Sequence, residues 1–141
     1  MFSKACKYAI RAVLYLATHS NETKKFGVKD VAEVLDVPKA YLAKLLQQLA
    51  KEGIIASSKG SNGGFYLADG HREAHLRDII ECIDGAAALK DCVLGLSVCS
   101  SDNPCALHHD VLKFRQNLDR TLSQRTVANV TSSIKKKKLK I

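Results

Sequence analysis

The sequence predicts a mainly α-helical protein with a small β-wing, in which a winged helix-turn-helix is followed by a long C-terminal dimerisation helix. Two adjacent apolar patterns at helical spacing, over 28–35 and 38–51, predict the paired helices. A glycine-rich hairpin pattern directly after them predicts the wing. We expect a winged unit in residues 1–84, a cysteine-rich loop in 85–108, and the dimerisation helix with a basic tail in 109–141.

Residues 4–19 are predicted to form a first helix that is apolar on more than one side. One side carries Ala5, Ala9, Ala12, Val13 and Leu16, and the other apolar positions are Tyr8, Ile10, Leu14 and Tyr15. A helix of this kind is either enclosed by a core or shared with a second subunit. The polar stretch 20–27 then predicts a surface loop.

The second and third predicted helices meet at a tight corner, as in a helix-turn-helix. The second runs from about Lys29, and its apolar positions are Val28, Val31, Ala32 and Leu35. The third begins at Pro38, because the fixed φ of proline suits a first helical residue. It extends to Lys51 and buries a stripe of four leucines at helical spacing, Leu42, Leu45, Leu46 and Leu49.

The opposite face of the third helix suits DNA, because it is small, amide or cationic and carries no carboxylate that would repel phosphate. Its residues are Lys39, Ala40, Ala43, Lys44, Gln47 and Lys51. We expect contacts with double-stranded DNA from Lys39, Ala40, Tyr41, Lys44 and Gln47.

The hairpin that follows predicts a wing. Gly53 is expected to end the third helix as a left-handed cap, and strands are expected at 54–57 and 65–67. The tip combines flexible residues with one cation, so its backbone could approach a DNA groove closely. The expected contacts are Lys59, Gly60, Ser61, Asn62 and Gly63. Alone, this pattern is more typical of an ordinary surface hairpin, but its position after a helix-turn-helix favours a wing.

Length and charge limit the possible functions. A chain of 141 residues with 46% hydrophobic composition can bury one core, and no apolar run approaches the roughly 20 residues of a membrane span. We therefore expect a cytoplasmic protein without a membrane partner. The net charge is +8, but residues 92–141 hold most of the excess, so pI is a weak argument for DNA binding. The lysine-rich end, 135–140, could lie along phosphates, although a solvated tail is the more ordinary interpretation.

A cysteine-rich segment follows another predicted core helix at 75–83. It contains Cys92, Cys99, Cys105 and His108. We expect Asn103 to cap a helix that begins at Pro104, which would put Cys105 and His108 on one helical face. Clustered cysteines in a cytoplasmic chain favour metal or redox chemistry, and thiolates with imidazole suit zinc and iron-sulfur clusters alike.

The spacing of these cysteines leaves the kind of centre open. Six and five residues separate consecutive cysteines, whereas structural zinc sites commonly pair cysteines two to four residues apart. The alternative is a set of reduced thiols that could form a switchable disulfide, with His108 merely exposed on the surface.

The C-terminal region predicts a long amphipathic helix that reaches about Gln124, and Thr126 is expected to begin a last short helix. The apolar stripe of the long helix is Val111, Phe114, Leu118 and Leu122. Such a helix beyond a compact DNA-binding unit favours a homodimer, since twofold operators require twofold proteins. The sequence shows no catalytic nucleophile paired with a general base, so we expect no enzymatic activity. A small electron-transfer protein would leave residues 39–64 unexplained.

The order of these parts resembles the Rrf-type family of bacterial winged-helix transcription regulators, which includes iron-sulfur, nitric-oxide and cysteine-metabolism regulators. The resemblance spans nearly the whole chain. It rests on Tyr8-Ala9-Ile10-Arg11-Ala12, Tyr15-Leu16-Ala17, Val37-Pro38, Tyr41-Leu42, Leu49-Ala50-Lys51-Glu52-Gly53-Ile54-Ile55, Lys59-Gly60-Ser61-Asn62-Gly63-Gly64-Phe65, Cys92, Cys99, Cys105 and His108.

The resemblance implies a homodimer crossed by its long C-terminal helices, and a 2Fe-2S cluster whose presence, oxidation state or degradation controls DNA binding. The implied ligands are Cys92, Cys99 and Cys105, with His108 as the fourth. The nitric-oxide branch instead holds a 4Fe-4S cluster with an aspartate at the position of Lys7, so that ligand is missing here. The cluster-assembly regulator discriminates between DNA sites with a glutamate where this chain has Ala43. A zinc- or thiol-dependent regulator of the same fold is the alternative.

Overall fold

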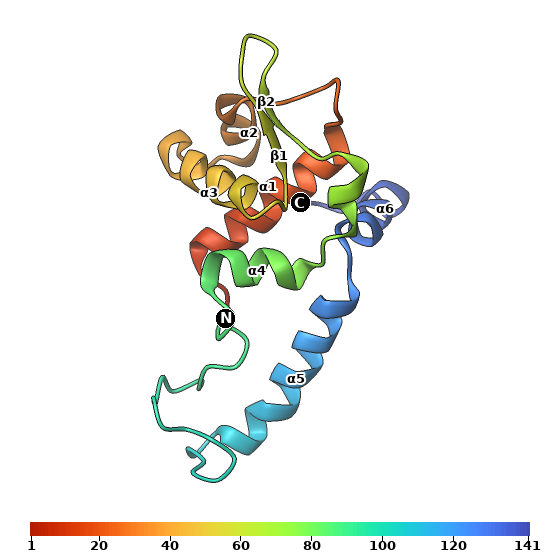
Figure 1. The fold of residues 1–141 in the computed structure, drawn as a ribbon. Helices are drawn as coiled ribbons and strands as arrows, with labels where there is room; N and C mark the ends of the chain where they lie inside the picture. Colours follow the sequence, from red (N-terminus) through yellow and green to blue (C-terminus); the bar gives the residue numbers. More distant parts are fainter.

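The computed structural model describes residues 1–141, and its elements are six α-helices, one 3-10 helix and a two-stranded antiparallel sheet (Figure 1). In chain order they are α1 (Lys4–His19), α2 (Val28–Leu35), α3 (Lys39–Lys51), β1 (Ala56–Ser58), β2 (Gly64–Tyr66), η1 (Asp69–Glu73), α4 (Leu76–Asp84), α5 (His108–Gln124) and α6 (Val127–Lys137). This is the mainly helical architecture with a small wing that the sequence predicts. No helix combines the length and the apolar character needed to cross a membrane.

The centre of the winged unit is α1, which contacts α2, α3, α4 and α6 (Figure 1). Seven of its residues are buried, namely Cys6, Ala9, Ala12, Val13, Leu14, Leu16 and Ala17. The sequence left open whether this helix is enclosed by its own chain or by a second subunit, and the helices of its own chain enclose it. Its N-terminus is fixed because the hydroxyl of Ser3 accepts the amide of Cys6 at 2.9 Å.

The helix-turn-helix consists of α2 and α3, joined by the short turn that the sequence predicts. Asp36 ends α2 in the left-handed conformation with φ of 53°, which aspartate tolerates better than most residues. The guanidinium of Arg11 on α1 donates to the carbonyl of Leu35 at 3.0 Å and so holds this corner. Pro38 is the N-cap of α3 rather than its first helical residue, because its ψ of 125° is extended. All four predicted core leucines of α3 are buried.

The wing pairs β1 with β2, with Ser57 opposite Phe65. β1 begins two residues later than the predicted 54–57, because the buried Ile54 still donates its amide to Leu49 in α3. β2 begins one residue earlier than the predicted 65–67. Phe26 exchanges both backbone hydrogen bonds with Phe65, at 3.0 and 2.8 Å, and so ties the loop before α2 to the sheet. A Cβ at Gly64, where φ is 143°, would lie 2.7 Å from the Phe26 carbonyl oxygen, so this approach requires glycine.

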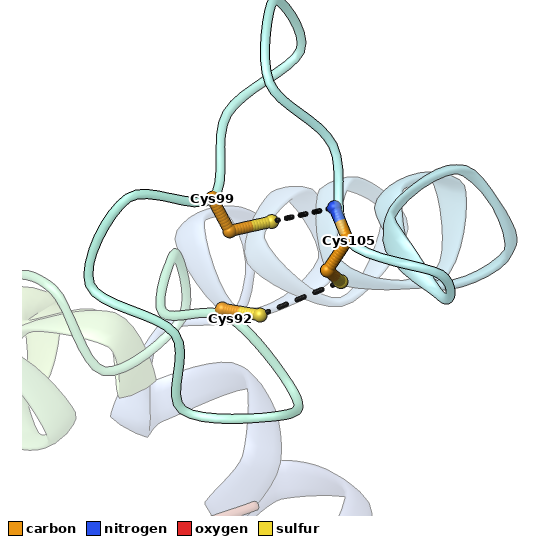
Figure 2. Close-up of side chains that lie close together, drawn as sticks. All are labelled: Cys92, Cys99 and Cys105. Carbon is orange, nitrogen blue, oxygen red and sulfur yellow. Dashed lines mark hydrogen bonds between the residues drawn. The ribbon is translucent and has the colours of Figure 1, made fainter.

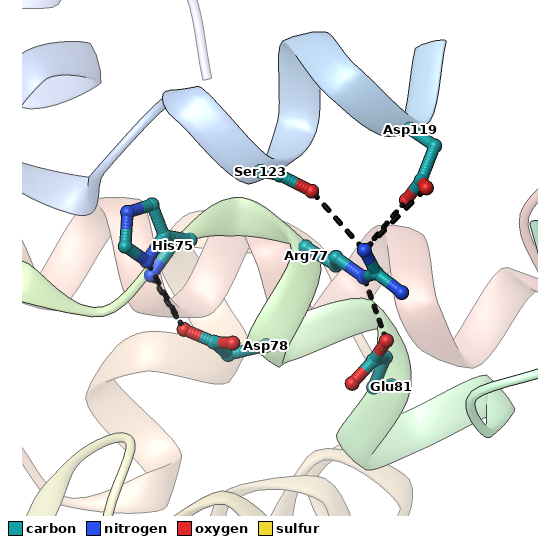
Figure 3. A network of polar contacts seen from close by, with 6 residues as sticks. All are labelled: His75, Arg77, Asp78, Glu81, Asp119 and Ser123. Carbon is teal, nitrogen blue, oxygen red and sulfur yellow. Dashed lines mark hydrogen bonds and ion pairs between the residues drawn. The ribbon is translucent and has the colours of Figure 1, made fainter. Parts of the chain in front are cut away.

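The long helix α5 projects away from the winged unit, and it contacts that unit through α4 (Figure 1). Arg77 of α4 joins the two helices (Figure 3). Its Nε donates to Glu81 at 2.7 Å, and its terminal nitrogen lies 3.2 Å from Asp119 Oδ1 and 3.3 Å from Ser123 Oγ on α5. These charge-assisted contacts tie the C-terminal half of α5 to α4.

The chain returns to the winged unit after α5. The backbone of Arg125 accepts the amide of Leu76 at 2.9 Å, and the amide of Val127 donates to Ala74 at 2.8 Å. Thr126 caps α6, as predicted, by accepting the amide of Asn129 at 3.1 Å. The side chain of Val127 is fully buried in the core around α1. Both ends of α5 are therefore attached to other parts of the chain, with the cysteine-rich loop at one end and α6 at the other.

Replacing Leu46 with alanine should lower the free energy of unfolding by about 2–5 kcal/mol, because it removes a fully buried side chain from the core between α1 and α3. Urea denaturation followed by circular dichroism at fixed protein concentration measures the change. Val34→Ala is the matched control, since Val34 is 60% exposed and should change stability by under about 0.5 kcal/mol. Equal losses for the two variants would contradict the assigned core.

Candidate functional site

Three thiols meet in the segment between α4 and α5 (Figure 2). The sulfur atoms of Cys92, Cys99 and Cys105 all lie within 4.8 Å of one another. The Cys92 thiol donates to Cys105 Sγ at 3.5 Å, and the Cys105 amide donates to Cys99 Sγ at 3.5 Å. The structure therefore brings together the three cysteines that the sequence singled out, as a group that could hold a metal centre.

This segment contains neither helix nor strand, so tight turns position the thiols. One turn closes between the Gly95 amide and the Cys92 carbonyl at 2.9 Å. The prediction that Asn103 caps α5 and that Pro104 begins it is wrong, because α5 begins at His108. Asn103 instead closes a local turn, donating its amide to Ser100 Oγ at 3.1 Å and its side-chain nitrogen to the Val98 carbonyl at 3.3 Å. Cys105 therefore lies on the loop and not on a helical face.

His108 lies beside the three thiols at the start of α5. Its side chain is only 6% exposed, with Nδ1 3.2 Å from Cys99 Sγ and Nε2 3.4 Å from Ser101 Oγ. The imidazole contacts one thiol and is outside the group of donors that all lie within 4.8 Å of one another. The neighbouring His109 is exposed, so His108 is the histidine that faces the cysteines.

Arg115 on α5 fixes the beginning of the loop, a role that the sequence reasoning missed. Its terminal nitrogen donates to the carbonyl of Lys90 at 2.7 Å and also to the carbonyl of Asp91. These two carbonyls directly precede Cys92, so Arg115 anchors one end of the cysteine segment to α5. Ser101, which contacts the far side of the His108 ring, was missed as well. Arg115 lies seven residues after His108, and this helical spacing could have indicated that both residues share one face of α5. The carbonyls that Arg115 binds could not be predicted, because they depend on the path of the loop.

The loop also alters the acidity of two thiols. Backbone amides of Leu96 and Leu94, together with the Cys105 and Cys99 thiols, stabilise the Cys92 thiolate and lower the pKa of this thiol to about 7. The Cys105 amide favours the Cys99 thiolate, but desolvation and the neighbouring thiols outweigh it, so the pKa of Cys99 is raised. The two thiols therefore differ in their tendency to ionise.

The expected DNA-contacting residues form an exposed surface on α3 and the wing. Lys39, Ala40, Lys44 and Gln47 are exposed, and Tyr41 is 38% exposed with its ring 5.9 Å from that of Tyr8 on α1. At the wing tip Lys59, Gly60, Ser61 and Asn62 are exposed, and Gly63 is half-buried. Between α3 and the wing lies a groove of about 460 Å³, lined by Gln47, Ala50, Lys51, Ser57, Ser58, Lys59, Gly64 and Phe65.

Three hydrogen bonds connect α3 and the start of α1 to the end of α4, where the cysteine segment begins. Gln48 on α3 donates its side-chain nitrogen to the carbonyl of Cys82 at 2.6 Å. Ser3, which caps α1, donates its amide to the Asp84 carboxylate at 2.9 Å and its hydroxyl to the same carboxylate. Residues 82–84 thus contact both the third helix of the DNA-binding unit and the start of α1.

The winged helix-turn-helix and the separate group of three thiols are together typical of a DNA-binding regulator. Residues 2–133 match the family model of Rrf2, described as "Iron-dependent Transcriptional regulator". The chain is 38% identical over 111 residues to a putative HTH-type transcriptional regulator of Aquifex aeolicus, covering 77% of this chain and 76% of that protein. The chain therefore belongs to the Rrf2 family of transcription regulators, and it is not an enzyme. The resemblance found in the sequence is confirmed.

Solved structures of the family have the same fold. CymR of B. subtilis, the global cysteine regulator, superposes with a TM-score of 0.74 at 20% identity, covering 94% of this chain and 97% of that one. IscR of T. potens superposes with a TM-score of 0.74 at 23% identity, covering 100% of this chain and 93% of that one. These similarities confirm the predicted winged-helix fold class.

Cys6 should resist alkylation in the folded protein at pH 8. Burial, followed by the nearby Asp84 carboxylate, raises the pKa of this thiol to about 12, so only about one Cys6 side chain in ten thousand is ionised at that pH. Because the shift disfavours the thiolate, reactivity should appear only well above pH 8 or after unfolding. Iodoacetamide labelling with peptide mass spectrometry, in buffer and in urea, measures it. Rapid labelling of Cys6 in native protein would contradict the buried placement.

Proposed function

We propose that the chain acts as a homodimer that binds double-stranded DNA and regulates transcription according to the state of a bound 2Fe-2S cluster. The observation that carries the proposal is the combination of an exposed cationic surface on α3 and the wing with three thiols grouped in the segment between α4 and α5. DNA as the partner implies action in the cytoplasm.

The surface of α3 and the wing supports DNA binding. Its side chains are cationic, amide, hydroxyl or small, and cations dominate affinity for the phosphate backbone. Lys44 and Gln47 lie on α3, which would enter a major groove, while Lys59 lies at the wing tip, which would reach the adjoining backbone or minor groove. Lys51 and Lys59 flank the groove between these elements, so a phosphate there would meet two positive charges.

The cysteine group supports an iron-sulfur cluster because its donors fit one. Three thiols within 4.8 Å supply three of the four ligands that such a cluster needs, and His108 Nδ1 lies next to Cys99. Cys92, Cys99 and Cys105 would hold the cluster, with His108 as the fourth ligand. The cluster would supply a redox-active and chemically labile centre. The description of the matched family as iron-dependent also favours iron over zinc.

A cluster-free thiol- or zinc-dependent regulator is the second candidate. The observation that favours it is that His108 is bonded to only one of the three thiols, Cys99, and is outside the group of mutually close donors. The similarity of the fold to CymR, described as a cysteine regulator, is compatible with this alternative. Iron, sulfide and zinc analysis separates the two candidates.

The surface of α5 supports a homodimer. Leu107 is 41% exposed and Phe114 is 54% exposed, while Val111 and Leu118 on the same helix are half-buried. Next to this helix lies an open cavity of about 640 Å³ lined largely by apolar side chains, including Met1, Leu89, Val93, Val111, Phe114 and Leu118. An apolar cavity beside a projecting helix suits the same helix of a second copy, and twofold pairing would present two DNA-binding units to one duplex.

The contacts at the end of α4 supply a physical connection between the cysteines and the DNA surface. Residues 82–84 precede the cysteine segment and are bonded to Gln48 of α3 and to Ser3 at the start of α1. A change in the loop that moved this segment would shift α3 relative to α1. Cluster binding would therefore favour one orientation of α3 by its differential contacts with the loop.

Replacing Lys44 or Lys59 with alanine should weaken DNA binding about fivefold at 0.15 M salt, because each lysine would neutralise one phosphate. The slope of log affinity against log salt should become shallower by about 0.9 for each variant. Fluorescence anisotropy with a duplex selected from random sequences measures both quantities. Lys113→Ala, which removes an exposed lysine from α5, is the control and should leave the slope unchanged.

The protein purified without oxygen should be coloured and should contain iron and acid-labile sulfide. Cys99→Ser should lose most of both, because it removes one of the three grouped thiols. Cys82→Ser is the matched control, since Cys82 lies on α4 outside the group, and it should retain iron. A colourless wild-type protein that contains zinc and no iron would overturn the cluster proposal and leave the DNA proposal intact.

A further inference from the structure

The three thiols are not equivalent, and the pair formed by Cys92 and Cys105 is distinct. Their sulfur atoms are 3.5 Å apart, with the Cys92 thiol donating directly to Cys105. The Cys99 sulfur also lies within 4.8 Å of both, but it has two further partners at shorter distances, His108 Nδ1 at 3.2 Å and the Cys105 amide at 3.5 Å. Figure 2 shows the Cys92 and Cys105 thiols in contact and the Cys99 thiol bonded to the Cys105 amide. The Cys99 thiol also contacts the imidazole of His108.

Contacts with α5 hold both members of this pair. Arg115 binds the carbonyls of Lys90 and Asp91, which immediately precede Cys92. Cys105 lies three residues before α5, and its carbonyl accepts the His108 amide at 3.0 Å. Contacts with α5 therefore anchor the chain on both sides of the loop that separates these two cysteines. To reach the roughly 2.05 Å of a disulfide, the sulfur atoms would have to approach each other by about 1.5 Å.

We propose that Cys92 and Cys105 form an intramolecular disulfide when the protein is free of a cluster, and that Cys99 remains a free thiol. The proposal rests on the proposed function only in that a cluster would use the same sulfur atoms. A peroxide is the oxidant. The thiolate of one cysteine attacks peroxide oxygen, so that an S–O bond forms, the O–O bond breaks and, after protonation, water leaves.

The second cysteine then attacks the sulfur of this sulfenic acid. An S–S bond forms, the S–O bond breaks, and the hydroxide takes up the proton of the second thiol as another water. In total, two thiols are oxidised to one disulfide while one peroxide is reduced to two waters. Since cluster ligands must be thiolates, the disulfide would prevent cluster assembly until a thiol reductant opened it.

Peptide mapping of the cluster-free protein tests the pairing. Iron is removed anaerobically with a chelator and a thiol reductant, both are removed, and equimolar hydrogen peroxide is added before iodoacetamide blocks the remaining thiols. Cleavage before Asp91 and Asp102 and after Leu94 and Leu96 separates the three cysteines onto different peptides. We expect a cross-linked peptide joining Cys92 to Cys105, together with alkylated Cys99. Before alkylation, the intact chain should be about 2 Da lighter than the fully reduced chain.

Single substitutions provide the controls. Cys99→Ser should form the disulfide as the wild type does, whereas Cys92→Ser and Cys105→Ser should form none. Circular dichroism verifies that each variant is folded. Dominant linkage of Cys99 to either neighbour, a disulfide between two chains, or no linkage in folded wild-type protein would overturn the proposal. The assay uses neither iron nor DNA, so a protein that never binds iron would defeat the cluster proposal while leaving this result interpretable.

Discussion

The burial of α1 is the interaction on which the rest of the structure depends. Four helices pack against it, and its small residues, such as Ala9 and Ala12, let those helices approach closely. Because α1 is enclosed by its own chain, α3 has a fixed base against which its leucine stripe can pack. The exposed side of α3 is therefore available for DNA with a defined orientation. Dispersion and the removal of apolar surface from water supply the stabilisation.

The core around α1 forms with little contribution from α5, so most of the α5 surface is left available for other contacts. Its charged and polar residues leave little to bury within one chain, and only Leu122 and His108 are buried along its 17 residues. The Arg77 contacts and the return of α6 to the core fix the end of α5 that lies near the winged unit. The other end, with the cysteines, extends away from the core (Figure 1). The helix thus joins the cysteine segment to the winged unit.

Periodicity and turn chemistry predict the parts of the fold whose causes are local. The leucine stripe of α3, the left-handed Gly53 and the capping Thr126 all act within a few residues, and the structure confirms them. Asn103 fails as a cap because its amide and side chain are used by Ser100 and Val98, which periodicity does not reveal. The grouping of the three thiols could be predicted because clustered cysteines commonly share a metal or redox site. The anchoring by Arg115 could not be predicted, because it depends on a loop path that no local rule describes.

The absence of regular structure around the cysteines has a mechanical consequence. A loop without helix or strand has no continuous ladder of backbone hydrogen bonds to resist displacement, so its geometry depends on local turns and on the contacts that its side chains make. Any bond that joined the sulfur atoms would replace weak thiol contacts by strong ones and would order the segment. The end of α4 would respond first, because residues 82–84 are bonded to α1 and α3 and continue directly into this segment. A loop of this kind can adopt different arrangements when the chemical state of its thiols changes, and so can displace the helix end to which it is attached. A rigid loop would have no second arrangement to adopt.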